Sequence, residues 1–373
     1  MTSCDVLIVG GGPAGSACAW ALRGSGLDVL ILDKKPFPRD KTCAGWITTA
    51  VVDLLEIDLE DYGRGRVLEP ITAFCIALMG GPEVTTHYGQ PISYGIRRCE
   101  FDHYLLERSG ARLELGKPLK SMERMDGHWI INGMIRARVV VGAGGHFCPV
   151  ARFLGGKSGR GELAVAAQEV EFAMTEEQLA ECAVPPGIPY IYFCEDLRGY
   201  GWYYRKGNYL NVGLGREDDE HLSSHVEVFC ESLRKRGKIP QSTPSKFHGH
   251  AYLLYIHAPR PLIGDGVLLV GDAAGLAYPQ SGEGIRPAIE SGLMAAGVIR
   301  TAGGNFGRDR LEPYQTRLTA RFGKKFTRSA SDFLPFGLKR FVAAKLMASP
   351  WFSRHVIVDR WFLHRHEPAL CSN

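Results

Sequence analysis

Three glycines near the start of the chain have the neighbours and the spacing that phosphate binding requires. Gly10, Gly12 and Gly15 follow the apolar run 6–9 and precede an alanine-rich stretch, so they lie between a predicted strand and a predicted helix. Gly10 permits a sharp turn, Gly12 lets backbone amides approach a pyrophosphate, and Gly15 lets the helix pack closely on the strand. Amides at the positive end of a helix favour phosphates without a lysine. This order favours a dinucleotide site over a glycine-rich turn without a ligand.

A second glycine motif lies much later in the chain. The apolar run 267–270 ends in Gly271 and Asp272. The strand predicted after the first motif, 28–32, ends in Asp33, whose carboxylate is placed to bind the ribose hydroxyls of an adenosine. Together the two motifs predict that the protein binds FAD. The alternative for the second motif is a tight turn that happens to carry an aspartate.

Composition limits the class of protein. The chain has 373 residues, 45% apolar and 23% charged, with 45 glycines, which is typical of a soluble, turn-rich α/β protein with two lobes. The net charge of +4 gives no reason to expect a nucleic acid partner. The ten cysteines show no CxxC spacing, so we expect reduced thiols. Because neither a signal peptide nor an apolar stretch of membrane-spanning length is found, we expect a cytoplasmic protein.

The order of predicted elements indicates a discontinuous nucleotide domain. A βαβ unit covers 4–33, and nucleotide-type strands return at 267 after a β-rich stretch between about 163 and 258. Within this frame we expect a hairpin-like pattern over 68–96, a meander over 122–135, and helices at 48–55, 101–107, 223–236 and 283–301. We expect a discontinuous FAD-binding domain made of 1–70, 96–162 and 259–305. The substrate domain inserted into it covers 71–95 and 163–258, and a helical C-terminal region covers 306–373.

Several short segments carry a family resemblance. Residues 98–102 match R-x-x-F-D, 139–145 match a strand that ends in A-D-G, with Gly144 in place of the aspartate, and 271–285 contain G-D-A-A-G, Pro279 and G-E-G-I. These segments resemble the flavoprotein superfamily that includes p-hydroxybenzoate hydroxylase and, more closely, the geranylgeranyl reductases. The resemblance covers residues 4 to 305. It implies a Rossmann-type FAD-binding domain with an inserted β-rich substrate domain and a helical C-terminal tail.

The resemblance also assigns roles around the flavin. It implies that Arg98 lies along the FAD, that Asp272 accepts hydrogen bonds from the ribityl chain, and that Gly282 and Gly284 open a helix whose amides face the flavin ring. With the motifs above, the expected FAD-binding residues are Gly10, Gly12, Pro13, Ala14, Gly15, Asp33, Lys34, Lys41, Cys43, Ala44, Gly45, Arg98, Gly142, Ala143, Gly144, Gly271, Asp272, Pro279, Gly282, Gly284 and Ile285.

Two further matches favour the reductase branch. Residues 41–45 resemble the K-x-C-G-G loop that passes by the isoalloxazine, with Ala44 for glycine. Residues 200–205 resemble the Y-x-W-x-F-P signature of the lipid pocket, with Tyr204 for phenylalanine and Arg205 for proline. The tryptophan halogenases carry W-x-W-x-I-P at a comparable place, whereas this chain has a single tryptophan there. Halogenation is therefore the less favoured chemistry.

The implied activity is reduction of carbon–carbon double bonds in an isoprenoid or polyene chain by an FAD-dependent oxidoreductase. The first alternative is an aromatic or polyketide monooxygenase that uses oxygen and NAD(P)H, and another is a flavin-binding protein without turnover. No second nucleotide fold is predicted for a permanently bound nicotinamide, so electrons would come from transient NAD(P)H or from a reduced redox protein.

The candidate catalytic residues are Cys43, Trp202 and Tyr204. Cys43 could gate the substrate or donate a proton, or it could be a small buried hydrophobic residue. Alternation along a strand places Trp202 and Tyr204 on one face with Tyr200, where they would line a surface for an elongated apolar or aromatic ligand or belong to the ordinary core. His248 and His250 are expected to be packed or exposed, without a metal site.

The tail beyond residue 310 is expected to be helical, basic and aromatic. Apolar residues such as Phe341 and Trp351 alternate with basic ones such as Lys339 and Arg354. One interpretation is an amphipathic cap that makes peripheral contact with a membrane, where lipid-linked substrates are found. The other interpretation is a cap over the substrate lobe.

Overall fold

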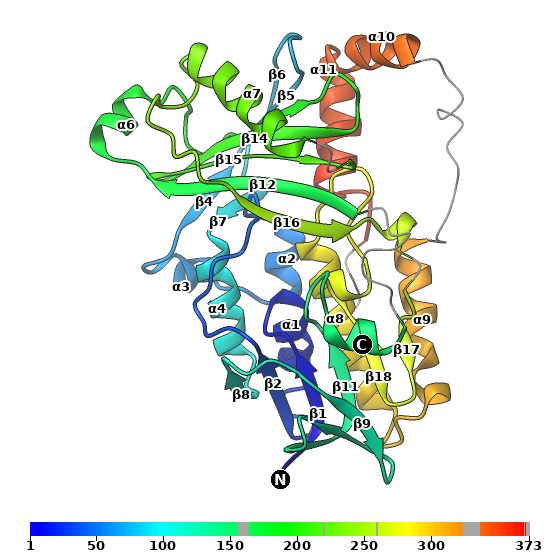
Figure 1. Cartoon of the computed structure of the whole chain (residues 1–373). Helices are drawn as coiled ribbons and strands as arrows, with labels where there is room; N and C mark the ends of the chain where they lie inside the picture. The colour runs from blue at the N-terminus through cyan, green and yellow to red at the C-terminus, as the bar shows by residue number, and fades with distance from the viewer. Residues whose placement is uncertain (156–163, 219–220, 259, 324–335, 369, 371–373) are drawn as a thin grey trace.

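A computed structural model describes residues 1–155, 164–218, 221–258, 260–323, 336–368 and 370 (Figure 1). Its first lobe is built on an eight-stranded sheet with the path β17-β18-β11-β1-β2-β8, in which β9 and β10 extend from β11. The four pairs from β18 to β8 are parallel. The strands are β1 (Thr2–Val9), β2 (Val29–Asp33), β8 (Arg112–Leu115), β9 (Met122–Met125), β10 (His128–Ile131), β11 (Ile135–Gly142), β17 (Ile263–Gly264) and β18 (Val267–Leu269).

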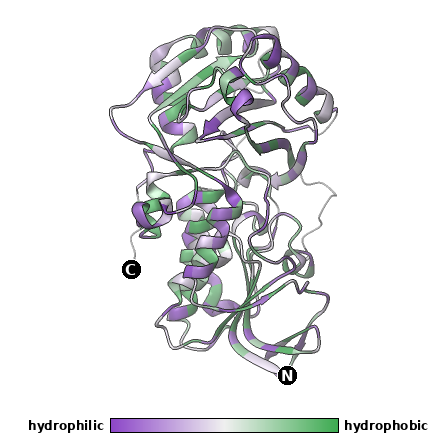
Figure 2. Ribbon diagram, turned by 90° about the vertical axis from the view of Figure 1, so that its left-hand side faces the viewer, coloured by the Kyte–Doolittle hydropathy of each residue, from purple (hydrophilic) through white to green (hydrophobic). Residues whose placement is uncertain are grey.

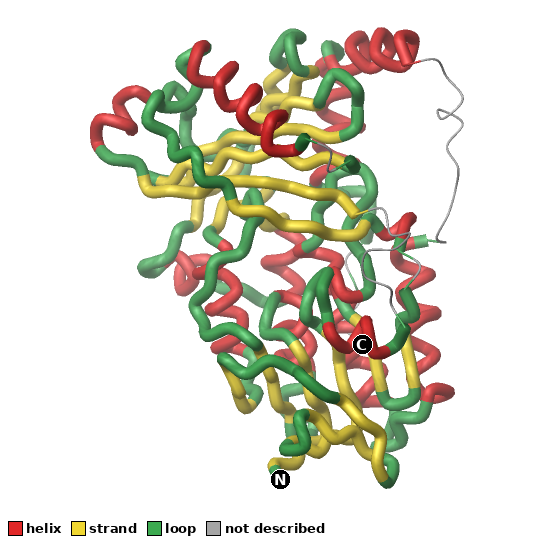
Figure 3. Tube along the Cα trace, in the orientation of Figure 1, coloured by secondary structure: helices red, strands yellow, loops and turns green. Residues whose placement is uncertain are grey.

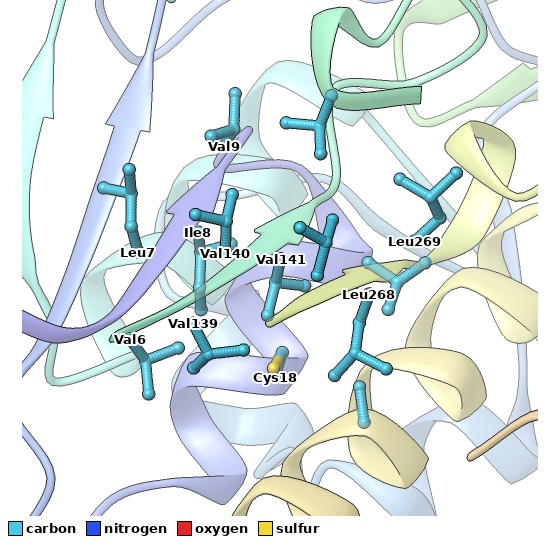
Figure 4. Packing of buried hydrophobic residues seen from close by; sticks show 14 of the residues in the cluster. Val6, Leu7, Ile8, Val9, Cys18, Val139, Val140, Val141, Leu268 and Leu269 are labelled. Atoms are coloured by element: carbon cyan, nitrogen blue, oxygen red, sulfur yellow. The ribbon is translucent and has the colours of Figure 1, made fainter. Parts of the chain in front are cut away.

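The core of this lobe lies between the parallel strands and their helices. Apolar side chains of β1, β11 and β18 point into it together with Cys18 of α1 (Pro13–Ala21) (Figure 4). Such continuous apolar runs are typical of parallel strands covered on both faces. Helix α1 packs on α8 (Ile285–Thr301) so closely that a Cβ at Gly292 would lie 2.3 Å from the carbonyl oxygen of Ala14. Small residues at this crossing therefore set the spacing of the two helices.

The second lobe is built on a seven-stranded sheet with the order β16-β12-β15-β14-β13-β5-β6. All its pairs are antiparallel except β13 with β5. In Figure 2, as in Figure 1, this lobe lies above the first. The strands are β5 (Ala73–Leu78), β6 (Val84–His87), β12 (Ala164–Ala173), β13 (Tyr190–Phe193), β14 (Gly199–Lys206), β15 (Tyr209–Arg216) and β16 (His248–Leu253).

The segment 68–96, expected as one hairpin-like unit, is divided between two sheets. Its inner strands β5 and β6 form a hairpin in the large sheet of the second lobe. Its outer strands, β4 (Leu68–Ile71) and β7 (Ser93–Ile96), pair with each other in a separate three-stranded sheet with β3 (Trp46–Thr48). The expected domain boundaries at 70/71 and 95/96 fall inside β4 and β7, and those at 162/163 and 259 lie at or beside residues outside the described ones.

The helices lie near the expected positions, and Figure 3 shows how they surround the sheets. The expected helix 101–107 begins three residues earlier, at Arg98, and the expected helix 283–301 begins at Ile285, so Gly282 and Gly284 precede it. The first of these two helices is α4 (Arg98–Arg108). The other helices are α2 (Thr49–Leu54), α3 (Leu59–Gly63), α5 (Pro149–Phe153), α6 (Glu176–Glu181), α7 (Leu222–Lys235), α9 (Arg308–Phe322), α10 (Phe336–Met347) and α11 (Pro350–Phe352).

Shorter helical turns complete the fold. Two 3₁₀ turns, η1 (Tyr255–His257) and η2 (Gly271–Ala273), flank the last strands of the first lobe, and a π-helical segment, η4 (Ser353–Phe362), follows α11. Among the helices that the structure describes, none combines the length and the apolar character that crossing a membrane requires.

Candidate functional site

One cavity of about 500 Å³ lies between the two lobes and brings the sequence motifs together. Both glycine motifs, the loop around Cys43 and the aromatic strand β14 contribute to its wall. The expected site residues that line it are Gly10, Gly12, Pro13, Ala14, Asp33, Lys34, Lys41, Cys43, Ala44, Gly45, Arg98, Ala143, Gly144, Trp202, Asp272, Gly282, Gly284 and Ile285. The expected residues outside the lining are Gly15, Gly142, Tyr204, Gly271 and Pro279.

Two helix N-termini open into this cavity. Helix α1 begins at Pro13 after Gly12, and α8 begins at Ile285 after Gly284. The N-cap residues Gly12 and Gly284 have no side chain to cap these ends, but in α8 the Arg286 amide donates to Oε1 of Glu283 at 3.1 Å. Because the first amides of a helix are unpaired within it and carry partial positive charge, both ends favour an anionic or electron-rich group.

The first glycine motif is held close to the turn that follows β11. Gly10 has φ +117°, and a Cβ there would lie 2.3 Å from the carbonyl oxygen of Ala143. A Cβ at Gly15 would lie 2.0 Å from the carbonyl oxygen of Gly10. At Gly144, where the resembling family has an aspartate, a Cβ would approach the Cys148 sulfur to 3.2 Å. Only glycine fits the first two positions, whereas the third is tight because Cys148 fills the neighbouring space.

Asp33 braces the same turn. Its Oδ2 accepts a hydrogen bond from the Gly11 amide at 2.8 Å, and its Oδ1 accepts one from the Lys35 amide at 2.9 Å. A carboxylate has about four acceptor positions. Asp33 therefore retains acceptor capacity for a ligand hydroxyl in the cavity that it lines.

A buried ion pair fixes the arginine of the R-x-x-F-D segment. Arg98 donates from Nε and Nη2 to the two carboxylate oxygens of Asp102 at 2.8 and 3.0 Å, and Arg39 lies 3.5 Å from the same carboxylate. Burial alone would lower the pKa of the Arg98 guanidinium, but the Asp102 carboxylate and a hydrogen bond with Cys43 outweigh it and raise that pKa. Arg98 is thus a fixed cation in the cavity wall, beside Cys43.

Three ionisable side chains meet in the cavity although they are far apart in sequence. Lys41 Nζ lies 2.7 Å from Nε2 of His250, a residue 209 positions later, and His250 Nε2 lies 3.7 Å from Oδ2 of Asp272. Burial lowers the pKa of Lys41 to about 8. Burial and the charge of Lys41 lower the pKa of His250. For Asp272, burial is outweighed by the His250 hydrogen bond and by Lys41, so its pKa falls to about 2.

The loop that carries Cys43 is held by polar groups of the second lobe. The Cys43 amide donates to Glu169 of β12, and the Cys43 carbonyl accepts from Asn211 of β15 at 3.2 Å. Fully buried Lys206 donates to the carbonyls of Ala44 and Ile96 and forms an ion pair with Glu171. Burial raises the pKa of Glu169 to about 7, although it accepts hydrogen bonds from the Cys43 amide and Asn211.

The aromatic wall of the cavity differs from the expected one in one residue. Tyr200 and Trp202 line the cavity, but Tyr204 does not, so its expected place on the ligand surface is wrong. All three lie on one face of β14, as the pleat requires. However, Trp46 of β3 packs over Tyr204 with ring centroids 5.8 Å apart, and the Tyr204 hydroxyl donates to the Gly45 carbonyl. Trp46 takes the place of Tyr204 in the lining.

The two histidines of β16 differ in environment. His248 is exposed, whereas His250 and Tyr252 line the cavity. In the part of the chain that the structure describes, no group of three or more His, Cys, Asp and Glu side chains is arranged to hold a metal ion.

Comparisons with known proteins agree with this architecture. A model of the NAD(P)-binding Rossmann-like domain matches residues 8–60. The menaquinone reductase of Mycobacterium tuberculosis is 29% identical over 360 residues, which cover 87% of this chain and 82% of that protein. The digeranylgeranylglycerophospholipid reductase of Methanocaldococcus jannaschii is 28% identical over 322 residues, 80% of this chain and 77% of that protein.

Solved structures share the whole fold. A geranylgeranyl bacteriochlorophyll reductase-like protein of Thermoplasma acidophilum superposes with a TM-score of 0.74 and 23% identity, over 93% of this chain and 88% of that one. Most of the chain is thus similar in sequence to a digeranylgeranylglycerophospholipid reductase and in fold to a geranylgeranyl bacteriochlorophyll reductase-like protein. The halogenase PltM in complex with FAD shares the fold at a TM-score of 0.69 and 16% identity, over 97% of this chain and 85% of that one.

The site fits FAD. Two helix N-termini line one continuous cavity together with the carboxylates of Asp33 and Asp272. A Cβ at Gly284 would lie 3.2 Å from Oδ1 of Asp272, so the second helix begins directly beside that carboxylate. Amide donors suit a diphosphate and an electron-rich ring, and carboxylates suit sugar hydroxyls.

Proposed function

We propose that the protein is an FAD-dependent oxidoreductase that reduces carbon–carbon double bonds in the isoprenoid chain of a lipid. The observation that carries the proposal is the single cavity in which the helix N-termini of the first lobe face the aromatic wall of the second. The names of the two relatives, menaquinone reductase and digeranylgeranylglycerophospholipid reductase, both designate reduction of a lipid with isoprenoid chains and support this substrate class.

FAD would be held by groups of the first lobe. The amides at Gly12 and Ala14 would bind the diphosphate, Asp33 the adenosine ribose and Asp272 the ribityl hydroxyls. The Ile285 amide, which follows Gly284 at the start of α8, would stabilise negative charge on the flavin ring. When bound, FAD supplies the hydride for reducing a double bond, and the protein supplies binding, orientation and protons.

The substrate chain would lie against the aromatic wall. Trp46, Tyr200 and Trp202 give the cavity a flat apolar side with few hydrogen-bonding demands. The Tyr200 hydroxyl is already bonded to the Ser281 carbonyl, and Trp202 Nε1 donates to Asn211 at 2.7 Å. Because their polar atoms are satisfied, these side chains present apolar ring surface, which suits an isoprenoid and excludes water.

Reduction of a double bond also requires a proton, and Lys41 is our candidate donor. Its Nζ lies in the cavity, and burial brings its pKa to about 8, so its proton is held less tightly than that of an exposed lysine. The π bond would break as one carbon takes hydride and the other takes the Nζ proton. His250, 2.7 Å from Nζ, would return a proton to Lys41.

Cys43 would shape the cavity rather than donate the proton. Its backbone is held by Glu169 and Asn211, and it shares a hydrogen bond with the Arg98 guanidinium. It therefore has a fixed place in the cavity wall beside Arg98.

The decisive experiment is a single turnover without oxygen. The flavin of the purified protein is reduced chemically and mixed with a lipid that carries geranylgeranyl chains. We expect the oxidised flavin spectrum to return as the lipid gains two hydrogen atoms for each bond reduced, measured by mass spectrometry. An unchanged lipid, or a hydroxylated product that forms only when oxygen is admitted, would overturn the proposal. The same assay with NADH, NADPH or a reduced redox protein would identify the electron donor.

A further inference from the structure

Helix α10 presents an apolar face to the outside of the molecule. It lies at the end of the second lobe, opposite the N-terminus in Figure 1. Its outward residues and one residue of α11 are 40% to 65% exposed, which is unusual for large apolar side chains. They are Leu338, Phe341, Val342, Leu346 and Trp351, and they are called the α10 face below.

The opposite side of α10 packs on the protein. Ala343, Ala344 and Met347 contact an apolar cluster that also contains Trp46 and Tyr200. These last two residues line the cavity. Helix α10 is therefore the outer layer of a continuous apolar cluster that reaches from the surface to the proposed substrate wall.

The segment after α10 is firmly attached, so the position of the helix is defined. Phe362 of η4 packs on Trp46 and Tyr200 with ring centroids 6.2 and 5.5 Å apart. Asp359 accepts from the Tyr88 hydroxyl at 3.0 Å, and the His364 carbonyl accepts from Arg286 at 3.2 Å. The exposed face is thus part of a packed element.

The segment that carries the α10 face has only basic charged residues, one of which, Arg340, pairs with Glu195 of the second lobe at 2.9 Å. Residues 336–358 contain the four basic residues Lys339, Arg340, Lys345 and Arg354 and no aspartate or glutamate. Lys345 lies among the exposed apolar residues, with its Nζ 5.9 Å from the centre of the Phe341 ring. Long basic side chains beside apolar and aromatic ones are typical of helices that lie in the interface of an anionic membrane.

We propose that the α10 face docks on the surface of an anionic lipid bilayer, with the helix lying in the interface. A second copy of the chain is the less favoured occupant, because a symmetric contact would bring the mainly basic patch of one copy against the same patch of the other. This docking proposal rests on the proposed function in one respect, because a lipid substrate with isoprenoid chains resides in a membrane. Docking here would place such a lipid beside the apolar cluster that leads to the cavity.

The test is co-sedimentation of the full-length holoprotein with vesicles. Phosphatidylcholine vesicles are compared with vesicles that also contain phosphatidylglycerol. We expect binding to the anionic vesicles that weakens as salt is added. Phe341→Ser and Trp351→Ser should each weaken this binding about tenfold or more, because each removes a large apolar side chain from the interface. Val228→Ser, at a position 71% exposed on α7, is the matched control and should bind as the wild type does.

Thermal unfolding checks that each variant is folded, which is expected because the substituted side chains are exposed. Equal vesicle binding by the wild type, Phe341→Ser and Trp351→Ser would overturn the proposal. No binding of the wild type to anionic vesicles would also overturn it. A wild-type dimer that Phe341→Ser converts to monomer, without vesicle binding, would assign the face to a second copy. Vesicle binding without lipid reduction would leave the docking surface intact and would refute only the proposed function.

Discussion

The buried carboxyl of Glu169 gives a prediction whose size follows from the structure. Glu169 is 5% exposed, and burial raises its pKa from 4.5 to about 7. Between these two values the folded protein binds more protons than the unfolded chain, so this residue makes stability fall as pH rises. A difference of about 2.5 pKa units corresponds to about 3 kcal/mol. Glu169→Gln removes this dependence because the amide does not titrate.

The measurable quantity is the stability of Glu169→Gln minus that of the wild type. This difference in unfolding free energy should be about 3 kcal/mol larger above pH 7 than below pH 4.5. A constant effect of the amide on stability would shift the difference equally at every pH and would not change this rise. Glu283, whose pKa burial also raises to about 7, is present in both proteins and cancels. Denaturant titrations at a series of pH values give the difference, and Glu227→Gln on the exposed side of α7 supplies the baseline. A difference that stays flat with pH would refute the argument that the Cys43 loop is held by a buried, titrating carboxyl.

Other consequences are tested by single substitutions. Gly10→Ala should abolish flavin retention, because its Cβ would meet the Ala143 carbonyl. The control Gly24→Ala, at φ +70° with nothing within 4 Å and outside the cavity lining, should cost only about 1–2 kcal/mol and keep flavin. Flavin content and thermal midpoint decide this. Lys41→Met should lower the rate of single-turnover reduction about a hundredfold or more, whereas Cys43→Ala should keep most of that rate. A large loss of rate in Cys43→Ala and a small one in Lys41→Met would instead make Cys43 the proton donor. Tyr204→Phe should destabilise the protein by about 0.5–1.5 kcal/mol, because the Gly45 carbonyl loses one of its two donors and keeps the Ile96 amide; an unchanged denaturant midpoint would contradict this.

Local signals in the sequence were sufficient for the nucleotide lobe. Gly10 and Gly15 are identified by the strand and helix on either side of them, and the structure shows why each must lack a side chain. Parallel strands buried on both faces have long apolar runs, so β1, β11 and β18 were also visible in the sequence. The hairpin pattern over 68–96 gave the strands but could not show that they join different sheets.

The missed parts of the site depend on contacts between distant segments. The two-residue spacing of His248 and His250 was noticed, yet only the pairing of β16 at the edge of the sheet turns His250 toward Lys41. The shared face of Tyr200, Trp202 and Tyr204 followed from strand alternation. That Trp46 would cover Tyr204 could not, since Trp46 reaches it from a third sheet.

The anchoring of the Cys43 loop by Glu169, Asn211 and Lys206 limits how this architecture can be rebuilt. Although the loop follows β2 of the first lobe in the chain, its backbone is held by side chains of the second lobe. A chimera that exchanges the β-rich lobe for that of another flavoprotein would therefore also alter the rim of the cofactor cavity. To retain that rim, the graft would have to carry these three side chains at the same strand positions.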